Sequence, residues 1–361
     1  MMNTIGRLFR LTSFGESHGV AVGGVVDGCP AGIVLSVEEL QEELDRRRPG
    51  QSPLVSGRKE TDRLEVLSGI FEGKTTGMPI AFMVRNRDCR PEDYEALKDV
   101  FRPSHADFTW ESKYGIRDWR GGGRSSAREH VARVVAGGIA RQVLQRQGIR
   151  IVAYTSQVGN VALPEGYVPD SVMDVEKSAV RCPHSRTADK MEKLITEMQQ
   201  AGDSVGGVVS CRITGLPVGL GEPVFDRFQA RLAYAMMGIN AAKGFEYGEG
   251  FHAAEMRGSG HNDAFAWKEG KMRTATNHSG GIQGGITNGE EVYFRVAFKP
   301  VSSIRLPQDT VTRDGKTTTL EIKGRHDACV VPRAVPVVEA MAAMTVLDFL
   351  LEAGKYGNLT F

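Results

Sequence analysis

Several features that mark specialised protein classes are missing from this 361-residue chain. Its five cysteines stand apart and never form a Cys-x-x-Cys pair, so neither a metal site nor a disulfide framework is expected, and a reducing cytosol fits. An excess of one charge is also lacking, because 45 basic and 44 acidic residues leave a net charge of +1. With only 7% aromatic residues as well, no nucleic-acid-binding surface is expected.

Membrane and targeting signals are absent from the sequence pattern too. No apolar run approaches the length of a transmembrane span, so no membrane partner is expected. The first residues place Arg7 and Arg10 in an alternating pattern without an apolar core, so we expect no signal peptide. Proline-rich linkers and low-complexity tracts are missing. We therefore expect a cytoplasmic protein that forms a single domain over residues 1–361.

The order of strand and helix patterns predicts an α+β fold. Strand patterns occupy 4–12, 20–27, 63–71, 79–86, 149–158, 204–215, 291–299 and 317–323. Helical patterns occupy 36–48, about 125–147, 188–200, 225–237 and 333–353. Because the strands alternate instead of being apolar throughout, we expect antiparallel sheets packed against helices and not a doubly wound sheet.

Local signals refine three of these helices. Ser-Val-Glu-Glu from Ser36 to Glu39 is a capping box. Gly137-Gly138 interrupt the strongest helical pattern and predict a close contact with another helix. Gly123-Arg124 and Gly324-Arg325 each precede a helix rich in alanine and valine. This internal similarity is compatible with a duplicated βαβ-like unit, which the sequence alone does not decide.

The stretch at 121–128, Gly-Gly-Gly-Arg-Ser-Ser-Ala-Arg, is the most informative feature of the chain. Glycines allow close approach of the backbone, and the serines can cap a helix whose free N–H groups attract anions. The arginines supply forked donors for phosphate or carboxylate. A Walker lysine and Gly-x-Gly-x-x-Gly spacing are absent. The stretch predicts a phosphate cradle, with a glycine loop and solvent-facing arginines as the alternative.

Two histidines lie in short motifs suited to proton transfer. Gly-Glu-Ser-His-Gly exposes His18 in a tight loop, where it could protonate a leaving group, although this motif alone favours a polar turn between two strands. Arg-Pro-Ser-His-Ala-Asp places His105 between Arg102 and Asp107. Asp107 could fix the tautomer of His105 while Arg102 binds an oxyanion. The alternative is a structural Arg–Asp pair.

Three further motifs complete the set. The glycine-rich run 277–285 suits backbone laid against a flat ligand, or a long turn. Lys-Pro-Val-Ser-Ser at 299–303 offers a cation and hydroxyls after a strand, or a serine turn. Gly-Arg-His-Asp at 324–327 combines an arginine with an acid that could act as a base.

Taken in the order in which they occur along the chain, the six motifs resemble those of chorismate synthases. The resemblance runs from about residue 4 to about residue 350, and 160–200 is the least typical part. The resemblance implies the β-α-β sandwich of that family and a homotetramer. It also implies conversion of 5-enolpyruvylshikimate 3-phosphate to chorismate by 1,4-anti elimination of phosphate. The resemblance further implies a requirement for reduced FMN, although the reaction has no net redox change. Either the enzyme itself reduces FMN with NADPH, or a separate flavin reductase supplies the reduced FMN. The missing dinucleotide fingerprint favours a separate source of reduced FMN.

The resemblance assigns roles to individual residues. His18, with Ser17 beside it, is similar to the acid that protonates the departing phosphate. His105 matches the histidine near the flavin N1/O2 edge, and Asp327 matches the acid near flavin N5 that helps remove the C6 proton. The implied substrate contacts are Arg47, Arg48, Arg58, Arg102, Ser126, Ala127 and Arg128. The implied FMN contacts are Arg124, Ser125, Ser126, Asn240, Ala241, Gly284, Lys299, Pro300, Val301, Ser302, Ser303 and Arg325.

One departure from the family pattern and two competing functions remain. Many members carry an arginine soon after the Arg-Pro-Gly turn, where this chain reads Gln51-Ser52-Pro53-Leu54, so that Arg58 is the next candidate. A non-catalytic relative that binds a phosphorylated ligand is the first alternative, and the intact His18, His105 and Asp327 count against it. The second is an NAD(P)H-dependent flavin oxidoreductase with net electron transfer.

Overall fold

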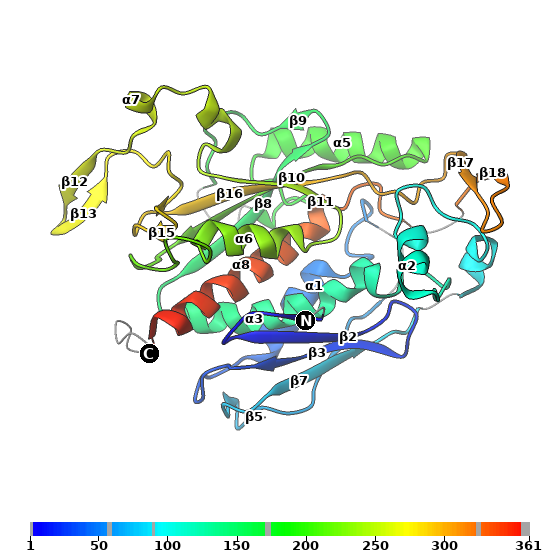
Figure 1. Cartoon of the computed structure of the whole chain (residues 1–361), viewed down its shortest axis with the longest axis horizontal. Coiled ribbons are helices and arrows are strands. Elements are labelled where there is room, and N and C mark those ends of the chain that lie inside the picture. The colour runs from blue at the N-terminus through cyan, green and yellow to red at the C-terminus, as the bar shows by residue number, and fades with distance from the viewer. Residues whose placement is uncertain (1–2, 56–59, 89–90, 170–174, 323–325, 355–361) are drawn as a thin grey trace.

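Two antiparallel five-stranded sheets enclose a layer of helices in the computed structural model of the chain (Figure 1). The structure describes residues 3–55, 60–88, 91–169, 175–322 and 326–354. Helices α1 (Val37–Arg47), α3 (His130–Arg146) and α8 (Val331–Gly354) form the middle layer. Helix α3 contacts the first sheet, and α8 contacts both α3 and the second sheet. The predicted α+β sandwich is therefore confirmed.

The first sheet has the strand order β1-β2-β3-β7-β4. Its strands are β1 (Thr4–Ile5), β2 (Arg10–Gly15), β3 (Ala21–Asp27), β7 (Ile80–Arg85) and β4 (Leu64–Val66). The expected strand 4–12 divides into β1 and β2. Between them, the N–H groups of Arg7, Leu8 and Phe9 donate to the Asp348 carboxylate of α8 at 2.7–3.1 Å and not to a neighbouring strand. The predicted strand 63–71 likewise divides, into β4 and a two-residue strand, β5 (Ile70–Phe71), which pairs with β6 (Lys74–Thr75).

The second sheet has the order β11-β16-β10-β8-β9. Its strands are β11 (Ala242–Tyr247), β16 (Val292–Phe298), β10 (Gly207–Thr214), β8 (Arg150–Val158) and β9 (Val161–Ala162). Helix α5 (Ser185–Ala201) lies against β8 and β9, and α6 (Phe228–Met237) packs on α8 and β11 (Figure 1). The larger apolar cluster runs from Phe9 to Leu350 between the layers, and a small second one joins Leu97, Leu320 and Ile322.

Shorter elements extend from these layers. Three hairpins are formed by β12 (Phe265–Lys268) with β13 (Lys271–Thr274), β14 (Ile282–Gln283) with β15 (Ile286–Thr287), and β17 (Gln308–Val311) with β18 (Thr317–Leu320). The remaining helices are α2 (Asp107–Tyr114), α7 (Gly258–His261) and 3-10 turns at Pro91–Leu97, Gly123–Ser125, Ala127–Glu129 and Gly250–Ala254. The strand expected at 317–323 is β18, which ends early at Leu320.

The helix starts differ from the sequence prediction in detail. Ser36 caps α1, because its hydroxyl accepts the Glu39 N–H at 3.1 Å. The Ser36 N–H, however, donates to Gln142 of α3 at 2.8 Å, so the reciprocal half of the capping box is replaced by a tertiary contact. Helix α3 begins at His130, since the chain from Gly123 to Glu129 first makes two 3-10 turns.

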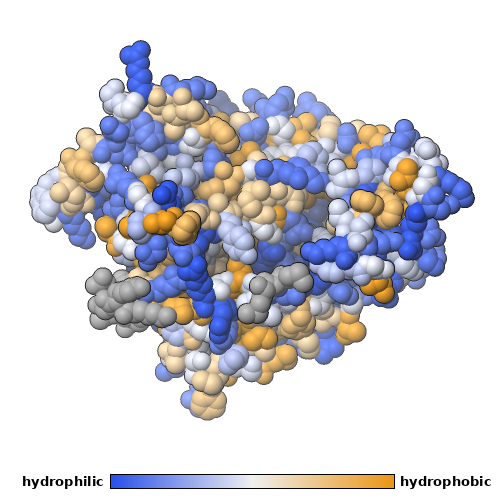
Figure 2. All heavy atoms as spheres, viewed as in Figure 1, coloured by the Kyte–Doolittle hydropathy of each residue, from blue (hydrophilic) through white to orange (hydrophobic). Residues whose placement is uncertain are grey.

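Helix α8 corrects the expectation that no apolar run approaches membrane-spanning length. By length and composition this helix could cross a membrane, but 94% of its most apolar stretch is buried inside the protein. Buried Glu339 and Asp348 interrupt its apolar pattern and pair with arginines of other elements. On the face seen in Figure 2, apolar side chains are scattered among hydrophilic ones. This helix is therefore the core helix of the sandwich.

The glycine pair in α3 makes the predicted close helix contacts. A Cβ atom at Gly137 would lie 2.3 Å from the backbone of Ala340 in α8. At Gly138 it would lie 2.7 Å from the tip of the Leu40 side chain in α1. The pair thus lets α3 approach two helices at once.

We expect Gly137→Ala to destabilise the protein by about 1–3 kcal/mol, because the added methyl group overlaps rigid backbone. Gly138→Ala is the matched control: the Leu40 tip can move, and alanine favours helix by up to about 1 kcal/mol, so its stability should stay within about 1 kcal/mol of wild type. Denaturant unfolding measures both variants. Equal stabilities would contradict the proposed helix contact.

Candidate active site

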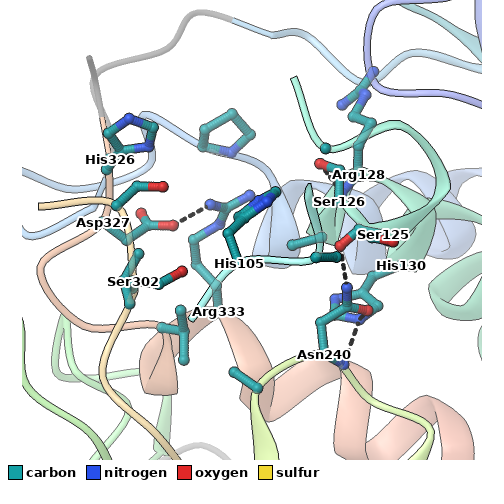
Figure 3. Close-up of a pocket in the computed structure, with 18 of the residues that line it drawn as sticks. His105, Ser125, Ser126, Arg128, His130, Asn240, Ser302, His326, Asp327 and Arg333 are labelled. Carbon is teal, nitrogen blue, oxygen red and sulfur yellow. Dashed lines mark hydrogen bonds and ion pairs between the residues drawn. The ribbon is translucent and has the colours of Figure 1, made fainter. Parts of the chain in front are cut away.

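A cavity of about 470 Å³ opens at one end of the helical layer. Segments far apart in sequence meet there: the loop after β2, the end of α1, the glycine-rich stretch and the start of α8. Figure 3 shows side chains from these segments facing a common space, with Asp327 and Arg333 on one side and Ser125, Ser126 and Arg128 on the other. Its size and mixed polar and apolar lining are those of a small-molecule site.

The first glycine of the glycine-rich stretch accommodates a histidine. Gly121 has φ +134°, and a Cβ atom there would lie 2.5 Å from His18 Nδ1. The His18 Nδ1 lies 3.0 Å from the Oγ of buried Ser17, and its ring meets that of Tyr94 edge-on at 4.9 Å. These contacts fix the imidazole at the cavity wall, and they require glycine at position 121.

His105 is fixed by a carboxylate, as the sequence suggested. Its Nδ1 lies 2.9 Å from Asp107 Oδ1. Burial lowers the pKa of His105, with a further contribution from Arg102. Although burial opposes ionisation of Asp107, hydrogen bonds from Arg102 and His105 hold the pKa of Asp107 well below its usual range. An ionised carboxylate only accepts, so the neutral imidazole carries its proton on Nδ1 and has its lone pair on Nε2.

Arg102 lines the cavity and also forms the Arg–Asp pair that the sequence suggested. Its Nε and Nη2 each donate to Asp107 at 2.7 Å, and Nη2 also donates to the Gly121 carbonyl at 3.2 Å. Two nitrogens of this fork therefore orient Asp107. The expected contact of Arg102 with a substrate oxyanion stays a prediction.

Three arginines converge on the cavity with two carboxylates between them. Buried Asp62 pairs with Arg47 at 3.3 Å and with Arg128, and Asp327 pairs with Arg333 at 2.6 Å. Burial and the guanidinium groups of Arg333 and Arg128 lower the pKa of Arg47 to about 9. Buried Arg128 Nη2 has no hydrogen-bond partner among the described residues. The cluster therefore carries an excess of positive charge that an anion would balance.

The glycine-rich stretch is held in place by side-chain contacts to its backbone. Ser126 Oγ accepts the Arg128 N–H at 3.2 Å, which caps the second 3-10 turn. Asn240 donates its amide to the Ser125 carbonyl at 2.6 Å (Figure 3). The Asn240 Oδ1 in turn lies 2.9 Å from Nε2 of His130, and burial keeps the pKa of His130 well below its usual range. His130 is therefore a neutral anchor for this wall.

The opposite part of the wall combines a cation, hydroxyls and strained backbone. Lys299, Ser302 and Ser303 line it, and the Lys299 N–H donates to the Ala241 carbonyl at 2.9 Å. Burial, with nearby Lys243, lowers the pKa of Lys299. Ala241 and Ser104, which faces the same cavity, have φ values of +68° and +56°. Such strain in residues other than glycine concentrates at functional sites.

Most residues that the sequence assigned to the site line this cavity. They are His18, Arg47, Arg102, His105, Ser125, Ser126, Ala127, Arg128, Asn240, Ala241, Lys299, Val301, Ser302, Ser303 and Asp327. Ser17 lies behind His18. Arg58 and Arg325 fall outside the described residues.

Four assigned residues do not line the cavity of this chain: Arg48, Arg124, Gly284 and Pro300. Arg48 turns to Asp45 on its own helix at 3.4 Å. Arg124 donates to the Gly15 carbonyl at 3.1 Å and thus ties the loop to β2. Gly284 lies in the turn between β14 and β15, with φ +63°. The expected contacts of these residues are therefore not assembled within the single chain.

Sequence reasoning missed several residues of the site. Asp62 and Asn86, which accepts from Arg128 Nε at 2.7 Å, belong to no motif and are brought in only by the fold. His130 lies two positions after the glycine-rich stretch, and Arg333 lies six positions after Asp327 at the start of a helix. Those positions were the available signals. In the described parts of the chain, no group of three or more His, Cys, Asp or Glu could hold a metal ion.

Comparisons with known proteins agree on one family. The family model described as chorismate synthase matches residues 9–351. The chorismate synthase of Parabacteroides distasonis is 58% identical over 350 residues, covering 97% of this chain and 98% of that protein. That of Opitutus terrae is 54% identical over 363 residues and covers both chains fully. A crystal structure of chorismate synthase superposes with a TM-score of 0.77 at 33% identity, covering 97% of this chain and 93% of the other.

The fit between Gly121 and His18 predicts a specific lesion. Gly121→Ala should displace the imidazole, because its methyl group would occupy the space of His18 Nδ1. The His18 ring should then lose the ring-current shift from Tyr94 in a histidine-selective NMR spectrum. Gly123→Ala is the control, since Gly123 also has a positive φ but no atom within 4 Å of its added methyl group. An unchanged His18 signal in Gly121→Ala would show that the loop yields instead.

Proposed function

This chain belongs to the chorismate synthase family, and on that premise we propose that it converts 5-enolpyruvylshikimate 3-phosphate to chorismate. Members of this family are lyases of the shikimate pathway. The proposed reaction removes phosphate from C3 and a hydrogen from C6 in a 1,4-elimination of anti geometry. It forms no net oxidised or reduced product.

The excess of guanidinium groups at the cavity is the observation that carries this proposal. The proposed substrate has one phosphate and two carboxylates, and the ion pairs that Arg47, Arg128 and Arg333 make among the described residues are with Asp62 and Asp327. The unpartnered Arg128 Nη2 supplies a donor in a region where an unsatisfied charge is costly. An oxyanion of the ligand would satisfy this donor and offset the one positive charge by which the three arginines exceed the two carboxylates.

The donors along the opposite wall fit FMN. Lys299, Ser302 and Ser303 provide a cation and hydroxyls, and Asn240 with Ala241 provides a backbone edge held by the Lys299 N–H. We propose that these residues and Ser125 hold reduced FMN. When bound, the flavin supplies transient electron density that helps to expel phosphate.

His18 is proposed to donate a proton to the departing phosphate. Its contact with Ser17 orients the ring, and Gly121 leaves room for it at the cavity wall. General acid catalysis needs a proton donor whose pKa lies near the operating pH, which an imidazole provides. His105, neutral and fixed by Asp107, is proposed to contact the flavin and adjust the charge around it.

Asp327 is proposed to take part in removal of the C6 proton. The carboxylate lines the cavity, and Arg333 holds its Oδ2 at 2.6 Å, which orients the group (Figure 3). The ion pair places this acid beside the same arginines that would bind the substrate. Proton removal at C6 and phosphate departure at C3 are thus assigned to separate side chains, Asp327 and His18.

Assembly and flavin supply complete the proposal. We infer a cytoplasmic homotetramer from membership of the family. Reduced FMN would come from a separate flavin reductase or from NADPH oxidised by the enzyme itself.

An anaerobic turnover assay tests the proposed reaction. With chemically reduced FMN, the purified protein should convert 5-enolpyruvylshikimate 3-phosphate to chorismate and phosphate, and with oxidised FMN it should not. Stoichiometric loss of reduced flavin would indicate an oxidoreductase instead. Binding of the substrate without turnover in either flavin state would indicate a non-catalytic relative.

Asp327→Asn tests the proposed base, because it keeps the size of the side chain and removes its ability to accept a proton. Turnover should fall by at least about tenfold, less than the usual 10²–10⁴-fold worth of such a group if neighbouring groups compensate in part, while FMN still binds. The kinetic isotope effect with substrate deuterated at C6 should rise. Asp226→Asn is the control, since Asp226 is paired with Arg7 at 2.5 Å outside the site. Lost FMN binding with unchanged turnover per bound flavin would make Asp327 structural only.

A further inference from the structure

A buried arginine in the least typical part of the sequence contacts the elements that carry the site. Arg181 precedes α5, is only 5% exposed and does not line the cavity. Its φ is +56°, a strained value for a residue with a side chain, and its carbonyl accepts the Thr155 N–H of β8 at 2.8 Å. Burial lowers the pKa of Arg181, so the surrounding structure must compensate for placing this charge there.

The guanidinium group of Arg181 bridges two helix ends. Nη1 donates to the Pro332 carbonyl in the first turn of α8 at 2.6 Å. Nη2 donates to the Arg46 carbonyl in the last turn of α1 at 2.7 Å and to Gln51 Oε1 at 2.8 Å. Nε lies 3.2 Å from both carboxylate oxygens of Glu176. Each nitrogen of this planar group therefore has a partner, an arrangement that lysine cannot reproduce.

The contact with α8 replaces a hydrogen bond that the sequence removes. Within an α-helix, the Pro332 carbonyl would accept the N–H of residue 336. That residue is Pro336, which has no N–H group. Arg181 supplies the missing donor and so completes the first turn of α8.

The two ends that Arg181 joins hold the cationic cluster of the cavity. Arg47 is the last residue of α1 and Arg333 lies in the first turn of α8. Arg333 Nε also donates to the Arg47 carbonyl at 3.1 Å. The adjacent carbonyls of Arg46 and Arg47 are thus bound by Arg181 and Arg333, which couples the two ends. Gln51 adds to this by donating to the Arg46 carbonyl at 2.8 Å.

We propose that Arg181 is a positioning residue that sets the spacing of Arg47 and Arg333 for the anionic groups of the substrate. The segment 175–184 thereby serves the site without touching it. This inference rests on the proposed function for what the arginines bind. Its structural part, that Arg181 orders the first turn of α8, is independent of the reaction.

The test compares two arginines that each bind α8. Arg181→Met keeps an apolar stem but loses the bridge near the cavity. Arg231→Met is the matched control, because Arg231 pairs with Asp348 and Glu352 near the other end of α8 and stacks over Phe349 at 4.0 Å. Arg181→Lys keeps the charge and can still pair with Glu176. Thermal unfolding establishes that each variant is folded.

For Arg181→Met, KM for 5-enolpyruvylshikimate 3-phosphate should rise by about tenfold or more, the worth of one weakened charge-assisted hydrogen bond, with kcat within about threefold. Amide hydrogen exchange should accelerate over residues 330–336. Arg181→Lys should also show a raised KM, because one ammonium replaces two nitrogens that contact different helices; it gives the same test if the Met variant does not fold. Arg231→Met should leave KM and the exchange at 330–336 unchanged.

Unchanged KM and exchange in both Arg181 variants would overturn the inference, as would an equal rise of KM in Arg231→Met, which would indicate general destabilisation. Full recovery of KM in Arg181→Lys would also overturn it, because charge alone would then suffice. If the wild-type protein makes no chorismate, the proposed function fails instead. In that case the exchange rate at residues 330–336 still decides whether Arg181 orders the turn.

Discussion

Repulsion among the guanidinium groups of Arg47, Arg128 and Arg333 is the constraint on which the site depends. These groups come from three elements distant in sequence, and Asp62 and Asp327 offset only part of their charge. Left without further partners, such a cluster opposes folding. The carbonyls at the end of α1 accept from the surrounding arginines, which partly compensates for the burial. An anionic group of a ligand would compensate for the rest.

The sandwich brings these arginines together through close helix packing. Gly137 lets α3 approach α8, and Gly138 lets it approach α1, so the ends of α1 and α8 meet beside the 3-10 turn that carries Arg128. At the cavity wall, the absence of a side chain at Gly121 likewise leaves room for the imidazole of His18. Glycine at these three positions thus determines where the proposed catalytic and binding groups lie.

The sequence predicted the parts of the site that lie in compact motifs. His18, His105 and the serines at 125–126 were identified because glycines, acids and hydroxyls next to them in the chain are also next to them in space. Asp62 and Asn86 were missed because only tertiary packing brings them to Arg128. Motifs also do not reveal where a side chain points. Arg124 lies in the predicted phosphate cradle, but its side chain turns to β2. Likewise, α8 is apolar enough to span a membrane, and only packing shows it to be core.

A crystal structure with oxidised FMN and 5-enolpyruvylshikimate 3-phosphate would show directly whether the three arginines bind the anionic groups of the substrate. We expect a phosphate or carboxylate oxygen of the substrate within hydrogen-bond distance of Arg128 Nη2, with Arg47 and Arg333 around the same group of anions. We also expect Asp62 to keep its ion pairs, since the ligand adds negative charge that the cluster lacks. A substrate bound with all its oxyanions away from these three arginines, and with Arg128 Nη2 still facing only protein, would contradict the account.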